Sequence, residues 1–101
     1  MSNAVYNFEE LVILIPAYNP SKTLKHFVHK LKNHFSRIII INDGSTQGLD
    51  VIDEISRLAG VEILTHPQNR GKGAALKSGF NRIGKIDTIS LAEEFANNIQ
   101  E

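Results

Sequence analysis

The sequence contains no cysteine and no tryptophan, and it has only one methionine. The absence of cysteine excludes disulfide bonds and thiolate metal sites, and it is compatible with a reducing compartment. Neither sign of charge is in excess, because 11 lysines and arginines balance 11 aspartates and glutamates. A net charge of zero gives no general attraction to polyanions, so we expect no nucleic-acid partner.

Long hydrophobic runs are missing as well. The longest, from Leu11 to Pro16, is far shorter than the ~20 residues that a membrane-spanning helix needs. No basic segment followed by a long apolar stretch opens the chain, which argues against a secretory signal. An apolar content of 42% is ordinary for a globular protein. From these features we expect a cytoplasmic protein.

Three runs rich in branched apolar residues, at 11–15, 37–41 and 61–65, alternate with stretches of helical periodicity. The first two runs are apolar at nearly every position, which is typical of strands buried on both faces of a parallel sheet. The alternation predicts an α/β fold with three layers, α/β/α, and parallel βαβαβα order. The apolar residues of the helical stretches are Leu24, Phe27, Val28, Leu31 and Phe35, then Val51, Ile52, Ile55 and Leu58, then Ala75, Leu76, Gly79, Phe80 and Ile83.

Residues that commonly cap helices predict where these helices begin and end. Ser21 is placed to cap the first helix, and Ser45 or Thr46 the second. Gly60 and Gly84 are expected to end the second and third helices, because glycine adopts the left-handed conformation that stops a helix.

The last part of the sequence departs from this rhythm. Residues 86–89 begin like a fourth strand, but residues 90–93, Ser-Leu-Ala-Glu, form a capping box. Leu91, Phe95 and Ile99 then recur at helical spacing, which predicts a C-terminal helix. Its apolar face has to pack on this chain or on another, and we therefore expect a homo-oligomer.

Open parallel sheets bind ligands beyond the carboxyl ends of their strands. The first of these ends carries residues 16–20, Pro-Ala-Tyr-Asn-Pro. The prolines restrict the backbone, and the ring of Tyr18 can pack against a flat ligand. Taken alone, the segment is equally typical of an ordinary strand-to-helix turn in which Tyr18 covers the core.

The second strand is followed by residues 42–46, Asn-Asp-Gly-Ser-Thr. Asp43 is expected just beyond the sheet, where its carboxylate can accept a hydrogen bond from a ring N–H of a base. Gly44 permits a turn with positive φ. The alternative is a plain turn followed by a helix cap, for which the same residues are well suited.

The third strand leads to residues 69–76, Asn-Arg-Gly-Lys-Gly-Ala-Ala-Leu. Glycines, two basic side chains and a helix start suit the oxygens of a phosphate or a sugar nucleotide. The segment is not a Walker loop, because no serine or threonine follows Lys72. Leu76 replaces the last glycine of a G-x-G-x-x-G motif, so a Rossmann dinucleotide site is not predicted either.

In this order and at these strand ends, the three segments resemble the start of a family 2 glycosyltransferase, closest to members similar to dolichyl-phosphate mannosyltransferases. The resemblance runs from about residue 11 to residue 87. It implies the nucleotide-binding half of a GT-A (Rossmann-like) fold and a nucleoside-diphosphate sugar, UDP- or GDP-linked, as partner. By position, the resemblance implies that Pro16, Ala17 and Tyr18 line the nucleoside pocket and that the Asp43 carboxylate binds the base. It also implies that Gly71, Lys72 and Gly73 lie near the base, ribose or diphosphate.

The family also uses an Asp-x-Asp motif that holds Mg²⁺ or Mn²⁺ against the diphosphate. At the corresponding place this sequence has residues 92–94, Ala-Glu-Glu. We therefore expect no metal, no cofactor and no catalytic residue in this chain, and Mg²⁺ or Mn²⁺ only in a full-length member. We therefore interpret residues 1–8 as an extension or tag remnant and residues 9–101 as one truncated nucleotide-sugar-binding domain. The family's reaction is an inverting glycosyl transfer, and we expect this domain to be inactive in it when alone.

Parts of the sequence are also compatible with other functions. A non-catalytic nucleotide-binding or oligomerising module is the main alternative, and the predicted C-terminal helix favours it. His26, His29 and His34 share a helix with several lysines, so a solvated face is favoured over a zinc site. The same face could bring a full-length enzyme to a membrane surface. Neither Ser45 nor Ser78 has a recognisable histidine and carboxylate partner in the sequence, which disfavours a serine hydrolase.

Overall fold

The computed structural model describes residues 11–84. The predicted extension at 1–8, the strand-like residues 86–89 and the predicted C-terminal helix lie outside the described residues. The elements that are described alternate between strand and helix, as the sequence predicts. They are β1 (Val12–Ala17), α1 (Lys22–Lys32), β2 (Arg37–Asp43), α2 (Leu49–Ser56), β3 (Val61–His66) and α3 (Lys72–Ile83).

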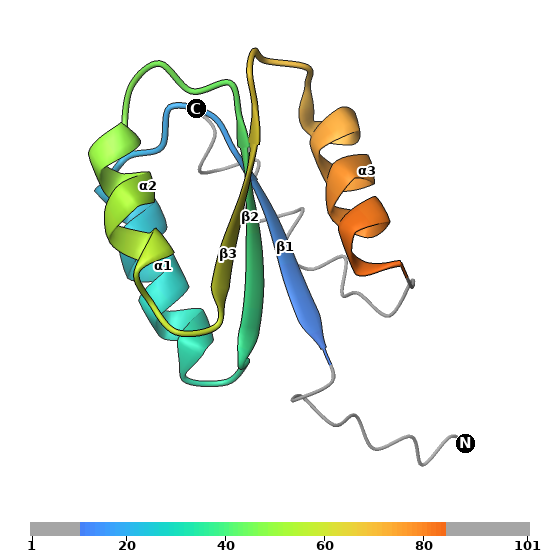
Figure 1. Ribbon diagram of the computed structural model, residues 1–101. Helices are drawn as coiled ribbons and strands as arrows, with labels where there is room; N and C mark the ends of the chain where they lie inside the picture. Colours follow the sequence, from blue (N-terminus) through green and yellow to red (C-terminus); the bar gives the residue numbers. More distant parts are fainter. Residues whose placement is uncertain (1–10, 85–101) are drawn as a thin grey trace.

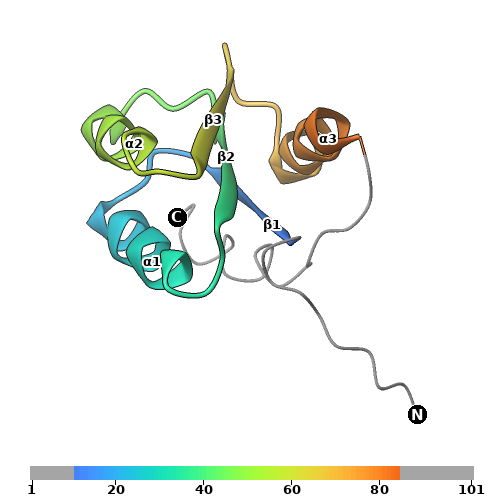
Figure 2. The same cartoon turned by 60° about the horizontal axis from the view of Figure 1, so that its bottom comes forward.

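The three strands form one parallel sheet in the order β1-β2-β3. Helices α1 and α2 lie on one face and α3 lies on the other, which Figures 1 and 2 show from two directions. The predicted three-layer α/β/α fold with parallel βαβαβα order is therefore confirmed. Ala17 of β1 pairs with Asn42 of β2, and Asp43 of β2 pairs with His66 of β3. This register brings the carboxyl ends of all three strands to one edge of the sheet.

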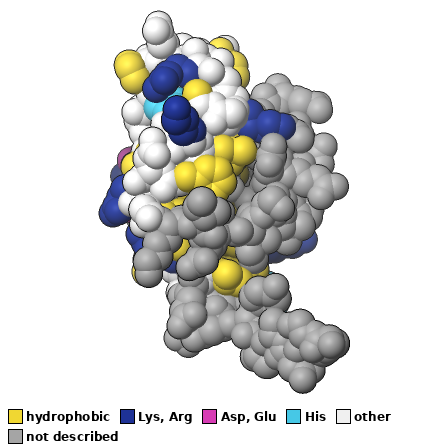
Figure 3. Space-filling view, turned by 90° about the vertical axis from the view of Figure 1, so that its right-hand side faces the viewer, with side chains coloured by type: hydrophobic (Ala, Val, Ile, Leu, Met, Phe, Trp, Pro, Cys, Tyr) yellow, Lys and Arg dark blue, Asp and Glu magenta, His cyan; other side chains and the backbone are white. Residues whose placement is uncertain are grey.

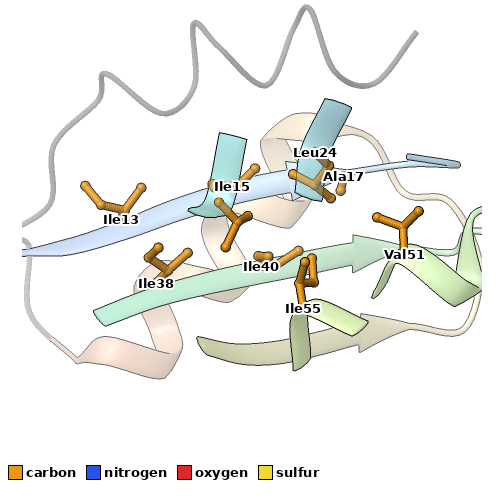
Figure 4. Close-up of a cluster of buried hydrophobic side chains, with 9 residues drawn as sticks. Ile13, Ile15, Ala17, Leu24, Ile38, Ile40, Val51 and Ile55 are labelled. Carbon is orange, nitrogen blue, oxygen red and sulfur yellow. The ribbon is translucent and has the colours of Figure 1, made fainter. Parts of the chain in front are cut away.

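Each face of the sheet has its own apolar core, because side chains of a strand alternate between faces. The alternation explains why β1 and β2 are apolar at successive positions. The core under α1 and α2 is shown in Figure 4 and contains Ile13, Ile15, Ala17, Leu24, Val28, Ile38, Ile40, Val51 and Ile55. The core under α3 contains Val12, Leu14, Ile39, Ile41 and Ala75.

Helix α3 comes close to the sheet at Gly79. A Cβ atom at this position would lie 2.9 Å from Cδ1 of Leu14 and 3.2 Å from Cδ1 of Ile41. A side chain here would therefore force these core residues to shift. The glycine allows α3 to lie directly on the strands that carry the loops described below.

The observed helix ends confirm two of the predicted caps and correct two. The hydroxyl of Ser21 accepts a hydrogen bond from the Thr23 N–H, and Gly84 ends α3 in the left-handed conformation. The second helix is not capped by Ser45 or Thr46; it begins after Gly48, and no side chain caps it. Oγ of Ser45 instead accepts from the N–H of Asn19, and the backbone N–H of Thr46 donates to Oδ1 of Asn19. Gly60 does not end α2, which stops at Ser56.

Candidate functional site

Residues of the first predicted segment divide between strand and loop. Pro16 and Ala17 continue β1 and are buried, whereas Tyr18 begins the loop and is half-buried. A proline is accommodated in this strand because β1 has a strand neighbour on one side only within the described sheet. Of the three residues, Tyr18 therefore offers the accessible side chain, and Pro16 and Ala17 support the loop from below.

Asn19 joins the loop after β1 to the loop after β2. Its φ angle is +49°, a left-handed conformation that asparagine adopts more readily than most residues. Its Oδ1 accepts hydrogen bonds from the backbone N–H groups of Thr46, at 2.8 Å, and Gln47, at 3.0 Å. Its own N–H donates to Oγ of Ser45 at 2.8 Å. The side chain and backbone of one residue thus bind three groups of the neighbouring loop.

Two further contacts fix this first junction. The N–H of Ser45 donates to Oδ1 of Asn42 at 3.0 Å, which closes the turn directly after β2. Gly48 has a φ of +72° and lies against Pro20, where an added Cβ would collide with the proline carbonyl oxygen. The junction between the two loops is therefore built from uncharged hydrogen bonds and close backbone packing.

Asp43 joins the end of β2 to the loop after β3. Its Oδ1 accepts from the N–H of Arg70 at 2.9 Å, and its Oδ2 accepts from the N–H of Gly71 at 2.8 Å. Nδ2 of Asn69 donates to the Asp43 carbonyl oxygen at 3.2 Å. Gly44 packs so closely against residues 68–69 that an added Cβ would collide with their backbone.

The position of Asp43 corrects the expectation that it lies just beyond the sheet. It is the last residue of β2, and its side chain is 0% exposed. Burial raises the pKa of this carboxyl, but the hydrogen bonds from His66, Arg70 and Gly71 outweigh burial, and the attraction of the His66 ring in its protonated form adds to them. The pKa of Asp43 is consequently lowered, and the carboxylate is ionised at neutral pH.

His66 is a site residue that the sequence analysis did not identify. Its Nδ1 lies 2.8 Å from Oδ1 of Asp43, and its Nε2 lies 2.8 Å from Oγ of Ser78. Ser78 thus has the histidine and carboxylate neighbours that were not recognisable in the sequence. The strand register contains the missing signal, because Asp43 and His66 are paired final residues of adjacent parallel strands.

The start of α3 completes the site. Gly71 precedes the helix with a φ of +96°, and no side chain caps the helix at this end. Lys72 is half-buried and Gly73 is exposed. The first N–H groups of a helix attract anions, and basic side chains next to them strengthen that attraction. Figure 3 shows Lys and Arg side chains gathered at the upper end of this side of the molecule, next to a histidine side chain and apolar surface.

The described residues carry little that suits a metal ion. Within residues 11–84, no three His, Cys, Asp or Glu side chains are grouped closely enough to hold one. His26, His29 and His34 are exposed on and just after α1. The Ala-Glu-Glu segment at 92–94 lies outside the described residues. No helix within 11–84 is long and apolar enough to cross a membrane.

The predicted site residues are therefore brought to one edge, but they do not all face outward. Tyr18, Lys72 and Gly73 offer an aromatic ring, a positive charge and a helix start to a ligand. Asp43 is turned inward and binds the backbone of the third loop. A positive charge, a helix start and an aromatic ring are groups that suit an anionic ligand with a flat ring.

Comparison with known proteins agrees with this description. The family model described as "Glycosyl transferase family 2" matches residues 12–84. An uncharacterized protein of Methanocaldococcus jannaschii is 34% identical over 75 residues, which is 73% of this chain and 30% of that protein. An uncharacterized glycosyltransferase of Escherichia coli is 39% identical over 84 residues, 79% of this chain and 21% of its own length.

A relative with a more specific name is the UDP-N-acetylglucosamine–dolichyl-phosphate N-acetylglucosaminyltransferase of Methanococcus voltae. It is 31% identical over 87 residues, which is 71% of this chain and 35% of the relative. The chain thus spans about a third or less of the length of these relatives. No solved structure gives a significant match.

Proposed function

Because this chain belongs to glycosyl transferase family 2, we propose that its described residues bind the nucleotide part of a nucleoside-diphosphate sugar at the carboxyl edge of the sheet. The observation that carries the proposal is the joining of three loops, distant in sequence, around Asn19 and Asp43. Loops at this edge of a parallel sheet are the usual place for nucleotide binding. Family 2 enzymes use nucleotide sugars, and the fold is that of the nucleotide-binding half of a GT-A domain.

In this proposal the ring of Tyr18 packs against the base, and Lys72 with Gly73 at the start of α3 binds the diphosphate. Asp43 contributes chiefly by fixing the N–H groups of Arg70 and Gly71. A base N–H reaches this carboxylate only if the third loop moves aside, because the side chain is fully buried.

The acceptor and the complete reaction are further parts of the proposal. Three relatives carry dolichyl phosphate in their names, one from Methanococcus voltae and two from Trichomonas vaginalis. We propose that a longer protein containing this sequence transfers the sugar to a phosphorylated lipid. The lysines of α1 would face the anionic membrane surface. Residues 1–101 alone would bind the donor without completing the transfer, because residues 92–94 do not supply the Asp-x-Asp metal ligands.

Isothermal titration of the chain with UDP and with GDP tests donor binding. We expect saturable binding of at least one nucleotide, with a Kd on the order of 1 mM or below. Lys72→Ala should weaken it by about tenfold or more, because a hydrogen bond to a charged group is worth roughly 1.5–3 kcal/mol and each 1.4 kcal/mol is about tenfold in affinity. The matched control is Lys77→Ala, an exposed lysine of the same helix, which should bind like the unmodified chain. Absence of heat with both nucleotides at millimolar concentration would contradict the proposal.

A second candidate function is a non-catalytic module that self-associates. Phe80 on α3 is 37% exposed and Leu49 at the start of α2 is 52% exposed, and large apolar side chains on a surface favour association. Light scattering at several concentrations separates the two candidates. A dimer whose formation is prevented by Phe80→Ser would support the module, whereas a monomer at all concentrations would eliminate it.

A further inference from the structure

We infer that His66 is a positioning residue that holds the third loop and the start of α3 in the arrangement needed for nucleotide binding. The inference rests on the proposed function, since it assigns a role within the same site. His66 is the last residue of β3, it is 7% exposed, and its ring lies between β2 and α3. One side chain therefore links three elements whose ends form the site.

The hydrogen bonds fix which nitrogen of the ring carries a proton. Both oxygens of Asp43 accept hydrogen bonds from backbone N–H groups, so the carboxylate also accepts from Nδ1 of His66. In the neutral ring Nε2 is then the acceptor, and the hydroxyl of Ser78 donates to it. Asp43 thus sets the ring tautomer, and Ser78 sets the ring orientation.

The same three residues have the order of a serine nucleophile with its base and its carboxylate. Ser78, however, lies inside α3, where backbone N–H groups donate to carbonyl groups of the preceding turn. Backbone donors for an oxyanion are therefore not available beside it. The geometry points to a structural link through His66 rather than to hydrolysis.

The contact between His66 and Asp43 also affects the segment that we propose binds the ligand. Nδ1 of His66 donates a hydrogen bond to Oδ1 of Asp43, and the same oxygen accepts a hydrogen bond from the N–H of Arg70. The other oxygen binds the N–H of Gly71, the residue before α3. If the carboxylate is not oriented, both N–H groups lose their fixed partner and the start of α3 moves relative to Tyr18.

Two substitutions separate the contact of His66 Nδ1 with Asp43 from the contact of its Nε2 with Ser78. His66→Asn keeps a donor at the position of Nδ1 and removes the group at Nε2. His66→Gln keeps a polar group at the position of Nε2 and removes the Nδ1 donor. We expect His66→Asn to retain nucleotide affinity within about threefold, and His66→Gln to lose about tenfold, the effect of one buried hydrogen bond.

Amide hydrogen exchange at Arg70 and Gly71 reports the link without any nucleotide. Exchange there should be about tenfold faster in His66→Gln and close to the unmodified rate in His66→Asn, after normalisation to Ile40 in the middle of β2. If His66→Gln does not fold, Ser78→Ala replaces it, with an expected acceleration of about threefold at the same amides.

The outcomes separate this inference from the function on which it rests. Equal exchange and equal affinity in His66→Asn and His66→Gln would overturn the positioning role, as would unmodified exchange at Arg70 in Ser78→Ala. Binding of neither UDP nor GDP by the unmodified chain would overturn the proposed function, and hydrogen exchange would still decide whether His66 holds the loop.

Discussion

The loop after β2 is held to its two neighbours by different chemistry. On one side Asn19, which is half-buried, binds the N–H groups of Thr46 and Gln47. On the other side Asp43, which is fully buried, binds the N–H groups of Arg70 and Gly71. Each junction uses one side chain to bind two successive backbone N–H groups, but one acceptor is a neutral amide and the other is an ionised carboxylate.

The two junctions depend on charge to different degrees. A buried carboxylate needs several donors to remain ionised, and His66 with the two backbone N–H groups supplies them. A neutral amide has no such requirement. We therefore expect the junction at Asp43 to be the stronger of the two and the one that responds to pH, and the junction at Asn19 to be weaker and insensitive to pH.

Asp43→Asn should have the largest effect on stability. An asparagine places an NH₂ group where one carboxylate oxygen accepted hydrogen bonds, so at least one buried donor loses its partner. We expect the free energy of unfolding to fall by about 3 kcal/mol, measured by urea denaturation. Asp53→Asn is the matched control, because its carboxylate is exposed on α2 and should cost less than about 1 kcal/mol. Equal losses in both variants would remove the distinction between the junctions.

Acid should weaken the Asp43 junction alone. The pKa of Asp43 is lowered in the folded state, so its contribution is complete above the unfolded aspartate pKa of about 4. The contribution is lost as the pH falls through the lower, folded pKa. Urea denaturation between pH 7 and pH 2 should show a smaller acid-dependent loss in Asp43→Asn than in the unmodified chain. Parallel pH profiles would contradict the assignment of this charge.

Asn19→Ala should be the next most damaging substitution. It removes an acceptor for two N–H groups and places alanine at a positive φ, and we expect a loss of about 2 kcal/mol. Asn19→Gly keeps the backbone conformation accessible and should recover about 1 kcal/mol of that loss. Urea denaturation of both variants measures the difference. If alanine and glycine are equally destabilising, the positive φ has no energetic weight.

The smallest effect is expected away from the edge. Lys25 of α1 and Glu54 of α2 form an ion pair with a 2.6 Å N–O distance, and both side chains are substantially exposed. Glu54→Gln should lower the free energy of unfolding by no more than about 0.5 kcal/mol. A loss as large as that of Asn19→Ala would mean that the helix surface, and not the loop junction, holds α1 to α2.

Most of the fold was predictable from the sequence. The apolar runs of β1 and β2 and the spacing of residues such as Leu24 and Val28 depend on local periodicity, which a sequence displays directly. The cap at Ser21 and the stop at Gly84 are also local signals. The start of α2 was not predictable in this way, because it depends on contacts with Asn19, which lies 26 to 28 positions earlier in the chain. Oγ of Ser45, a candidate cap, accepts from the Asn19 N–H instead.

The candidate site was predictable only in part. The three loops could be placed on one edge, since that follows from parallel topology. The inward orientation of Asp43 and the role of His66 depend on contacts between residues 23 positions apart, which no local pattern displays. The aligned ends of β2 and β3 are the one signal that could have paired them.

Nuclear magnetic resonance can show whether the three joined loops form one nucleotide site. Amide chemical shifts of the ¹⁵N-labelled chain are followed while UDP or GDP is added. We expect saturable shifts concentrated at residues 18–19, 43–48 and 68–74, with little change at the opposite end of the sheet, near residues 36–38 and 59–61. Shifts confined to that opposite end, or to the exposed face of α1, would contradict it.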